Sequence, residues 1–253
     1  MAGHSKWANI KHKKGAADKK KGKIFSRITK EIMVAAREGG GDPDANPRLR
    51  TALTAAKSAN MPNANVERAI KKGTGEIEGE TFEELNYEGY GAGGVAVYVE
   101  CLSDNKNRTA SEIRTAFDRN CGNLAGVGAV TWMFHRKAQF VITGENADED
   151  KLMELLIDAG AEDISVSDGV AEVMSAPECF VDISKALETA GIPVEESGII
   201  YHPENTMKIE DEKVARQVLR LIEKLEDQDD VQAVYSNLDI ADDIMMKISE
   251  EAV

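Results

Sequence analysis

Hydrophobic residues recur with a helical period near the start of the chain. From Lys23 onward, at about 100° per residue, apolar side chains fall on one side of a helix; these are Ile24, Phe25, Ile28, Ile32 and Ala35. The basic residues fall on the other side, and these are Lys23, Arg27, Lys30 and Arg37. The pattern predicts an amphipathic helix with a buried apolar face and a solvent-facing basic stripe, ended by three glycines at 39–41.

Two further helices are predicted before residue 80. Asn46 as N-cap and Pro47 at the first helical position open a helix over 47–60. A short helix over 63–73 ends with two lysines and Gly73. Residues 1–22 are rich in lysine, glycine and alanine and lack apolar periodicity, so we expect a mobile or weakly helical arm. Residues 1–80 are therefore predicted to form a basic arm and an all-helical domain.

The pattern then changes to short β-like segments separated by helices. Residues 93–104 are rich in valine and bounded by glycine and by Asp104-Asn105, which is typical of a strand. A helix is predicted over 107–122. Residues 128–135 alternate, with Val130, Trp132 and Phe134 on one side, and we predict a second strand there.

Residues 137–202 contain a complete β-α-β-β-α-β series. The predicted strands are 138–143, 163–168, 170–176 and 194–202, and the predicted helices are 148–160 and 177–191. This order is that of a ferredoxin-like sandwich.

The C-terminal segment supplies a strand at 207–209, a helix at 210–227 and a strand at 231–237. These are the elements that 81–136 lacks for a second ferredoxin-like unit. We therefore predict an α+β protein of three domains: an N-terminal all-helical domain and two ferredoxin-like α+β domains, one inserted in the other. The limits are 1–80, 81–136 with 206–245, and 137–205 for the inserted domain.

Charge is divided unevenly along the chain. The protein carries a net charge of −14, yet residues 1–72 hold 17 basic and 6 acidic residues. A basic segment on an acidic body is typical of nucleic-acid binding. The alternative is that the basic third docks on the acidic remainder of the same chain.

The arm is the strongest candidate site. Its lysines neutralise phosphates, and planar rings between them suit stacking on unpaired bases. The predicted nucleic-acid contacts are Lys6, Trp7, Lys11, His12, Lys13, Lys14, Lys19, Lys20, Lys21, Lys23, Arg27 and Lys30. Alternatives remain open for two of these features: Trp7 as a hydrophobic plug against the first helix, and Lys19-Lys20-Lys21 as a solubilising segment.

Three other motifs favour structural roles. The glycines at 89, 91 and 94 match G-x-G-x-x-G, but a strand follows them where a dinucleotide site needs a helix. The glycines at 39–41 lack the G-K-[ST] ending of a phosphate loop. Residues 103–109 read S-D-N-K-N-R-T and suit an N-cap, with phosphate contact at a helix N-terminus as the alternative.

Catalytic and metal-binding patterns are missing from the sequence. Three separated cysteines and four histidines give no ligand cluster, and no nucleophile or Walker motif occurs. The acidic runs at 148–150 and 226–230 are interpreted as solvated helix ends. Free thiols, the lack of a secretory signal and the lack of a 20-residue apolar run lead us to expect a cytoplasmic protein with no membrane contact. We expect no enzyme, no cofactor, no metal and no small-molecule substrate.

Seven colinear motifs carry a family resemblance. They are MAGHSKWANIKHKK, GKIFSRITKEI, GGGDPDANPRLRTAL, AIKKGTGE, YEGYGAGG, ECLSDNKNRTASEIR and LEDQDDVQAVYSN. Together they resemble the YebC/PmpR family from the first residue to about Asn237. Ala125 and Ala129 stand where family members usually carry glycine and serine.

The resemblance implies a three-domain cytoplasmic protein without cofactor or enzymatic activity. Family members are mostly labelled probable DNA-binding transcriptional regulators. Others act in translation, among them a mitochondrial translational activator of a cytochrome oxidase subunit and bacterial members associated with ribosomes stalled on proline-rich nascent chains. The resemblance maps the family's nucleic-acid surface to the arm and the first helix, that is, to the nine lysines and the one arginine named above.

Two functions therefore remain open. One is a DNA-binding transcriptional regulator, which needs an element that reads base edges in a groove. The other is a ribosome-associated translation factor whose arm orders itself on ribosomal RNA. The acidic body repels a long duplex, which favours the second, while the usual family label favours the first.

Overall fold

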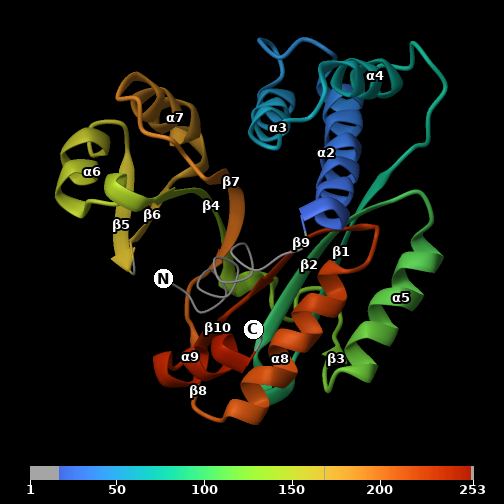
Figure 1. The fold of residues 1–253 in the computed structure, drawn as a ribbon. Coiled ribbons are helices and arrows are strands. Elements are labelled where there is room, and N and C mark those ends of the chain that lie inside the picture. Colours follow the sequence, from blue (N-terminus) through green and yellow to red (C-terminus); the bar gives the residue numbers. More distant parts are fainter. Residues whose placement is uncertain (1–16, 168, 252–253) are drawn as a thin grey trace. The chain divides into compact units, whose positions relative to one another are not determined.

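A computed structural model describes residues 17–167 and 169–251 (Figure 1). The chain forms two compact units. One is residues 134–204, and the other comprises the described residues before and after that segment. Each is described by itself below.

The first part of the larger unit is helical, as the sequence predicts. Its helices are α2 (Ala17–Gly39), α3 (Pro47–Ser58) and α4 (Asn63–Gly73). Helix α2 begins six residues earlier than the apolar pattern does, within the segment expected to be mobile or weakly helical. Asn46 caps α3 by accepting a hydrogen bond from the Leu49 N–H at 3.1 Å, as predicted. Its buried side-chain amide also donates to the carbonyls of Ala35 and Gly40, which fixes the turn between α2 and α3.

The three helices share one hydrophobic core with the start of the sheet region. Ile32 and Leu49 are fully buried, and Phe82 and Leu102 belong to the same cluster. Helix α4 crosses α2 closely at Gly73, where a Cβ atom would lie 2.5 Å from the Met33 carbonyl oxygen. A side chain at that position would force the two helices apart.

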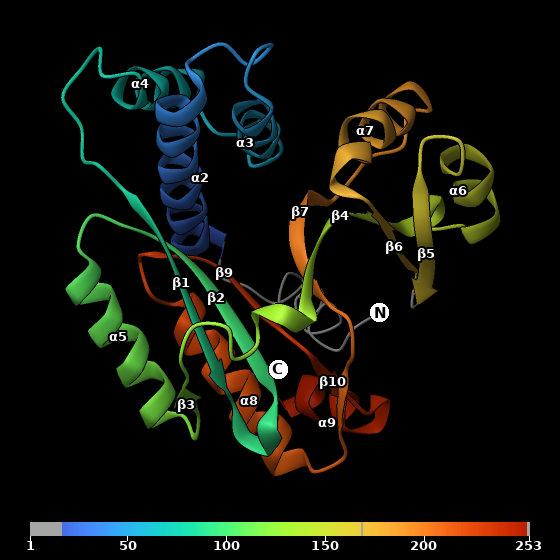
Figure 2. The ribbon, with the colours of Figure 1, turned by 180° about the vertical axis from the view of Figure 1, so that it is seen from behind.

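A four-stranded antiparallel sheet forms the second part of the larger unit. Its strands are β1 (Glu83–Tyr90), β2 (Ala96–Ser103), β3 (Asn123–Leu124) and β9 (Val231–Ser236), in the order β3-β1-β2-β9. Helices α5 (Lys106–Arg119) and α8 (Glu212–Glu226) lie side by side against one face (Figures 1 and 2). Their buried residues, among them Phe117 and Ile222, pack on Val97 and Val99 of β2.

Two predictions for this sheet are wrong. Residues 207–209 do not join it, because β8 (Met207–Ile209) pairs with β10 (Leu238–Ile240) in a separate two-stranded parallel sheet. Strands β1 and β3 of this sheet have no predicted counterpart. The two central strands, β1 and β2, are consecutive in the chain and form a hairpin, so the predicted ferredoxin-like connectivity of this sheet is wrong. Helix α9 (Asp242–Glu251) follows β10.

Residues 128–135 do not form the predicted strand. A short 3₁₀ helix (Thr131–Met133) occupies its middle, and β4 starts only at Phe134. The cause is Glu88, whose buried carboxylate accepts hydrogen bonds from the N–H groups of Gly128, Val130 and Thr131 at 2.7–2.9 Å. These bonds curl the chain around one side chain and leave Trp132 63% exposed.

Residues 134–204 fold as the sequence predicts for 137–202. The strands are β4 (Phe134–Thr143), β5 (Ala161–Ser167), β6 (Val170–Ser175) and β7 (Glu196–Pro203), and the helices are α6 (Glu149–Leu156) and α7 (Phe180–Thr189). The antiparallel order is β5-β6-β4-β7. Leu152 and Ile183 of the helices pack on Phe140 and Val173 of the sheet. The predicted domain limits stay predictions.

Candidate nucleic-acid interface

The predicted contact residues fall into three groups in the structure. Lys6, Trp7, Lys11, His12, Lys13 and Lys14 lie outside the described residues. Lys19 and Lys20 lie in the first turns of α2, where only the backbone is described. Lys21, Lys23, Arg27 and Lys30 follow along α2, and the structure divides these four into two pairs.

The first pair lies at the solvent-exposed start of α2. Lys21 is exposed, and its Nζ lies 5.8 Å from the centre of the Phe25 ring, within range of a cation–π contact. Lys23 is half-buried, and this partial burial, with the charge of nearby Arg27, lowers the pKa of Lys23. Both residues continue the positive charge of the arm into the helix.

The second pair contacts the sheet region instead of solvent. Arg27 Nη2 donates to the Glu226 carbonyl oxygen at 2.7 Å. Lys30 Nζ donates to the Asp229 carbonyl and to the Asp230 carboxylate, both at 2.9 Å. We call residues 226–230, Glu-Asp-Gln-Asp-Asp, the acidic turn. The prediction that the basic stripe faces solvent is therefore wrong at Arg27 and Lys30. At these two residues the structure has the alternative, in which the basic segment docks on the acidic part of the same chain.

Asp230 is the centre of this contact. Its side chain is 3% exposed, and Oδ2 accepts hydrogen bonds from Ser103, Arg108 and Thr109 at 2.7–3.0 Å. Burial alone raises a carboxyl pKa, but the hydrogen bonds from Arg108, Lys30 and Thr109 outweigh it and hold the pKa of Asp230 far below its usual range. Asp230 is thus ionised and joins α2, β2, α5 and β9 at one point.

This role of Asp230 differs from the prediction for residues 226–230, which are solvated helix ends in the interpretation of the sequence. A signal was available: the run is opposite in sign to the stripe on α2. A local sequence pattern does not predict which residues pair when they lie about 200 positions apart in the chain, as Lys30 and Asp230 do.

The other end of α2 is also engaged with its surroundings. Arg37 donates to the Phe82 carbonyl at 2.6 Å. From α3, Arg48 binds Glu31 and Glu38 of α2 and Glu84 of β1. These partners raise the pKa of Arg48, which therefore stays charged. Positive charge available to a ligand on α2 is consequently concentrated at its N-terminal end.

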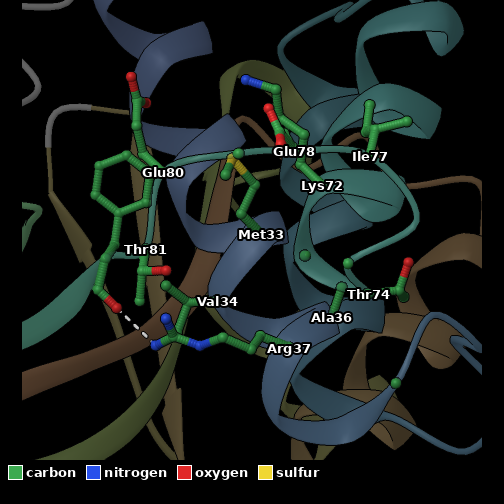
Figure 3. A pocket seen from close by; sticks show the side chains of 15 residues that line it. Met33, Val34, Ala36, Arg37, Lys72, Thr74, Ile77, Glu78, Glu80 and Thr81 are labelled. Carbon is green, nitrogen blue, oxygen red and sulfur yellow. Dashed lines mark hydrogen bonds between the residues drawn. The ribbon is translucent and has the colours of Figure 1, made fainter.

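A hollow of about 650 Å³ lies between α2, the end of α4 and the linker that follows it (Figure 3). Met33 and Val34 line it from α2, and Figure 3 shows the bond from Arg37 to the Phe82 carbonyl beside them. Lys72 and Arg37 are balanced by Glu78 and Glu80 of the linker. The hollow therefore has no net charge that would select a nucleic acid.

The remaining motifs have structural roles. Asn105 caps α5 by accepting a hydrogen bond from the Arg108 N–H at 3.1 Å. Lys106 forms an ion pair with Glu83. The Arg108 side chain forms ion pairs with Asp104 and Asp230. The glycine motif at 89–94 leads from β1 through a short 3₁₀ turn into β2. A strand and not an α-helix follows this motif, which excludes the dinucleotide fingerprint.

Metal and thiol chemistry find no support in the part of the chain that the structure describes. Within it, no group of three or more His, Cys, Asp and Glu side chains is arranged to hold a metal ion. The three cysteines are free thiols, and burial raises the pKa of Cys101 to about 12. Among the same residues, no helix combines the length and the apolar character that crossing a membrane requires.

Comparison with known proteins gives matches along most of the chain. Residues 5–76 match the TACO1/YebC protein N-terminal domain, and residues 82–238 match the TACO1/YebC second and third domain. A protein of Syntrophobacter fumaroxidans is 55% identical over 249 residues, covering 98% of this chain and all of its own length. One of Halothermothrix orenii is 53% identical over 253 residues, covering 99% and all of its own length. Both are named probable transcriptional regulatory protein.

A solved structure extends the likeness to three dimensions. The crystal structure of a conserved hypothetical protein from Aquifex aeolicus is 47% identical in sequence and superposes with a TM-score of 0.85. The match covers 93% of this chain and 97% of that one. The domain matches, the two full-length relatives and this structure agree, and the chain belongs to the TACO1/YebC family.

Proposed function

We propose that this protein is a non-enzymatic, cytoplasmic regulator of gene expression that binds nucleic acid through its basic arm and the N-terminal end of α2. The observation that carries the proposal is the position of Lys21 and Lys23. They extend the charge of the arm onto a rigid helix, whereas Arg27 and Lys30 beyond them are held by the acidic turn. The names of the relatives support transcription as the process regulated.

The experiment is a salt titration of binding by the full-length protein. The triple variant Lys19→Gln, Lys20→Gln, Lys21→Gln removes three charges at the start of α2. Each lost phosphate contact lowers the slope of log affinity against log salt by ~0.9 on duplex DNA and ~0.7 on single strands. A matched control, Lys57→Gln, Lys71→Gln, Lys72→Gln, removes the same charge from α3 and α4. Equal slopes for both variants would contradict the proposed site.

A ribosome-associated translation factor is the second candidate. It is favoured by the charge of residues 134–204, which hold 16 acidic and 4 basic residues. Such a unit is repelled by duplex DNA, whereas it attracts basic proteins. The arm would then bind ribosomal RNA, with relief of stalling on proline-rich nascent chains as the activity that the family resemblance implies.

Ultraviolet cross-linking in growing cells, followed by sequencing of the attached nucleic acid, separates the two candidates. Clustered genomic sites with ribosomal RNA at background would support the transcriptional regulator. Discrete ribosomal RNA positions would support the translation factor and make any effect on transcription indirect. A DNA regulator must also prefer its own sites over random duplex of equal length.

A further inference from the structure

Lys21, Lys23, Arg27 and Lys30 of α2 differ in the hydrogen-bonding capacity they have left. An ammonium group has three N–H donors. Lys30 Nζ has three acceptors within reach: the Asp230 carboxylate at 2.9 Å, the Asp229 carbonyl at 2.9 Å and the Leu102 carbonyl at 3.3 Å. The ammonium also lies 5.2 Å from the centre of the Phe82 ring, and the side chain is only 12% exposed. A phosphate would have to displace these acceptors to bind it.

Arg27 is made unavailable to a phosphate ligand in a different way. One of its terminal nitrogens donates to the Glu226 carbonyl, while its Nε is buried and has no hydrogen-bond partner among the described residues. A guanidinium recognises phosphate with two parallel N–H groups. Because Nε is buried, Arg27 cannot present the fork of Nε and a terminal nitrogen to a ligand in solvent, and the Glu226 carbonyl holds Nη2.

The acidic turn adds charge of the wrong sign for a phosphate. The side chains of Asp227 and Asp229 are exposed, and their charges act on the basic residues of α2. Both carboxylates raise the pKa of Lys23, against the lowering by burial. A nucleic-acid backbone that followed α2 past Lys23 would therefore meet fixed negative charge.

We propose that the acidic turn sets the boundary of the nucleic-acid surface on α2. It removes Arg27 and Lys30 from that surface, repels phosphates that pass Lys23, and so restricts contact to the arm and the first turns of the helix. Asp230 is the positioning residue of this device, because it fixes Lys30 and the turn together. This inference rests on the proposed function, since it concerns the extent of the same binding site.

The first test compares two lysines nine residues apart on the same helix. Lys21→Gln and Lys30→Gln are titrated with salt in the full-length protein, using a 20-nucleotide single-stranded RNA and a 20-base-pair duplex DNA as probes. We expect Lys21→Gln to lower the salt slope by ~0.7 to ~0.9 and the affinity by about fivefold at 0.1 M salt. We expect Lys30→Gln to leave the slope unchanged. Equal decreases in slope for the two variants would overturn the proposal.

A second pair of variants tests the repulsion and does not disturb the buried contact. Asp227→Asn with Asp229→Asn neutralises the exposed carboxylates of the turn. If each carboxylate lies about 10 Å from a phosphate in water, removal of the two negative charges raises the affinity about fourfold at low salt. This gain should disappear at about 0.5 M salt because the charges are then screened. The control Asp118→Asn with Asp243→Asn makes the same change in net charge on α5 and α9. Equal gains in both would contradict a local boundary.

The outcomes separate this inference from the function on which it rests. A wild-type protein that binds neither probe would contradict the proposed function. Binding by the wild type, with equal losses for Lys21→Gln and Lys30→Gln, would contradict only the boundary. Lys30→Gln could unfold the protein at the temperature of the binding assay. In that case the Asp227→Asn with Asp229→Asn variant, which changes only exposed side chains, tests the proposed boundary without it.

Discussion

The two four-stranded sheets differ both in the lateral order of their strands and in how they are assembled. Sheet β5-β6-β4-β7 is built from residues 134–203 in one continuous β-α-β-β-α-β series. Sheet β3-β1-β2-β9 takes three strands from before that segment and one from after it. Both carry two helices on one face. The same arrangement of layers is therefore compatible with either local or long-range chain connections.

The difference also appears in how each sheet is held in place. The core of residues 134–204 consists only of its own side chains. The discontinuous sheet shares Leu102 with the core of the helical region, and Asp230 beside β9 binds Lys30 of α2. The first sheet is thus a self-contained unit, while the second depends on segments from the whole chain.

Removing the self-contained sheet is the largest change that tests this comparison. His135 and His202 are cross-strand partners, so an Asn-Gly turn in place of residues 136–201 joins the two chain ends as a hairpin. We expect the shortened protein to lose one calorimetric unfolding transition and to keep the other within a few degrees. Loss of both transitions would show that the discontinuous sheet needs the inserted one.

Core truncations test the same independence at single residues. Phe140→Ala in one core and Ile222→Ala in the other each remove a fully buried side chain. We expect losses of about 3–5 kcal/mol for the first and about 2–5 kcal/mol for the second. Differential scanning calorimetry should place each loss in a different transition. A shift of both transitions by either variant would argue for coupled unfolding.

Glu88→Gln tests the side chain that shapes the chain just before β4. The amide keeps one acceptor, but its NH₂ group opposes a backbone N–H, so we expect a loss of about 2 kcal/mol at pH 7. The hydrogen bonds from Thr131, Val130 and Gly128 lower the pKa of Glu88 in spite of its burial. Its stabilisation is therefore full above the unfolded-state pKa of about 4.3 and is lost as pH falls through the lower folded-state value.

Urea unfolding of wild type and Glu88→Gln between pH 7 and pH 2 measures this. The difference in unfolding free energy should be constant down to about pH 5 and shrink below the unfolded-state pKa of about 4.3. A difference that does not change with pH would mean that the ionised carboxylate contributes nothing beyond its shape.

Substitutions of two glycines have the smallest expected effects on stability. The two glycines are a matched pair, with one in a strand of each sheet. In β1, a Cβ at Gly89 would lie 2.6 Å from Phe117 and 2.7 Å from the Asn123 carbonyl oxygen. In β7, a Cβ at Gly198 would meet nothing within 4 Å. We expect Gly89→Ala to cost about 1–3 kcal/mol and Gly198→Ala to stay within about 0.5 kcal/mol. Thermal unfolding of the two variants checks this, and similar shifts would contradict the packing described for Gly89.

The local sheet is the one that the sequence predicts well. Its strands and helices are bounded by turn residues, so each element is visible within its own segment. Strand β1 has the sequence Glu-Glu-Leu-Asn-Tyr-Glu-Gly-Tyr, with three glutamates and no β-branched residue. It is a strand because β2 and β3 pair with it, and that information is absent from the segment itself.

The candidate site shows the same limit. Helical periodicity groups Arg27 with Lys30 on one side of α2, but its prediction that this side faces solvent is wrong for both residues. It does not identify what covers that side, since the acidic turn is about 200 residues away in the chain. The positive charge of Arg27 and Lys30 suits a nucleic-acid ligand and an acidic segment of the same chain equally well. Only the fold shows which of the two these residues contact.

Glu88 has a further consequence for the time scale on which the surface of this protein opens. The amide hydrogens of Gly128, Val130 and Thr131 lie in a loop that carries the almost fully exposed Val127. Such amides ordinarily exchange with deuterium quickly. Here all three are bonded to a carboxylate anchored within the sheet, so we expect their exchange to be much slower than that of their neighbours in the loop. Part of a surface loop would then exchange on the time scale of the protein's interior.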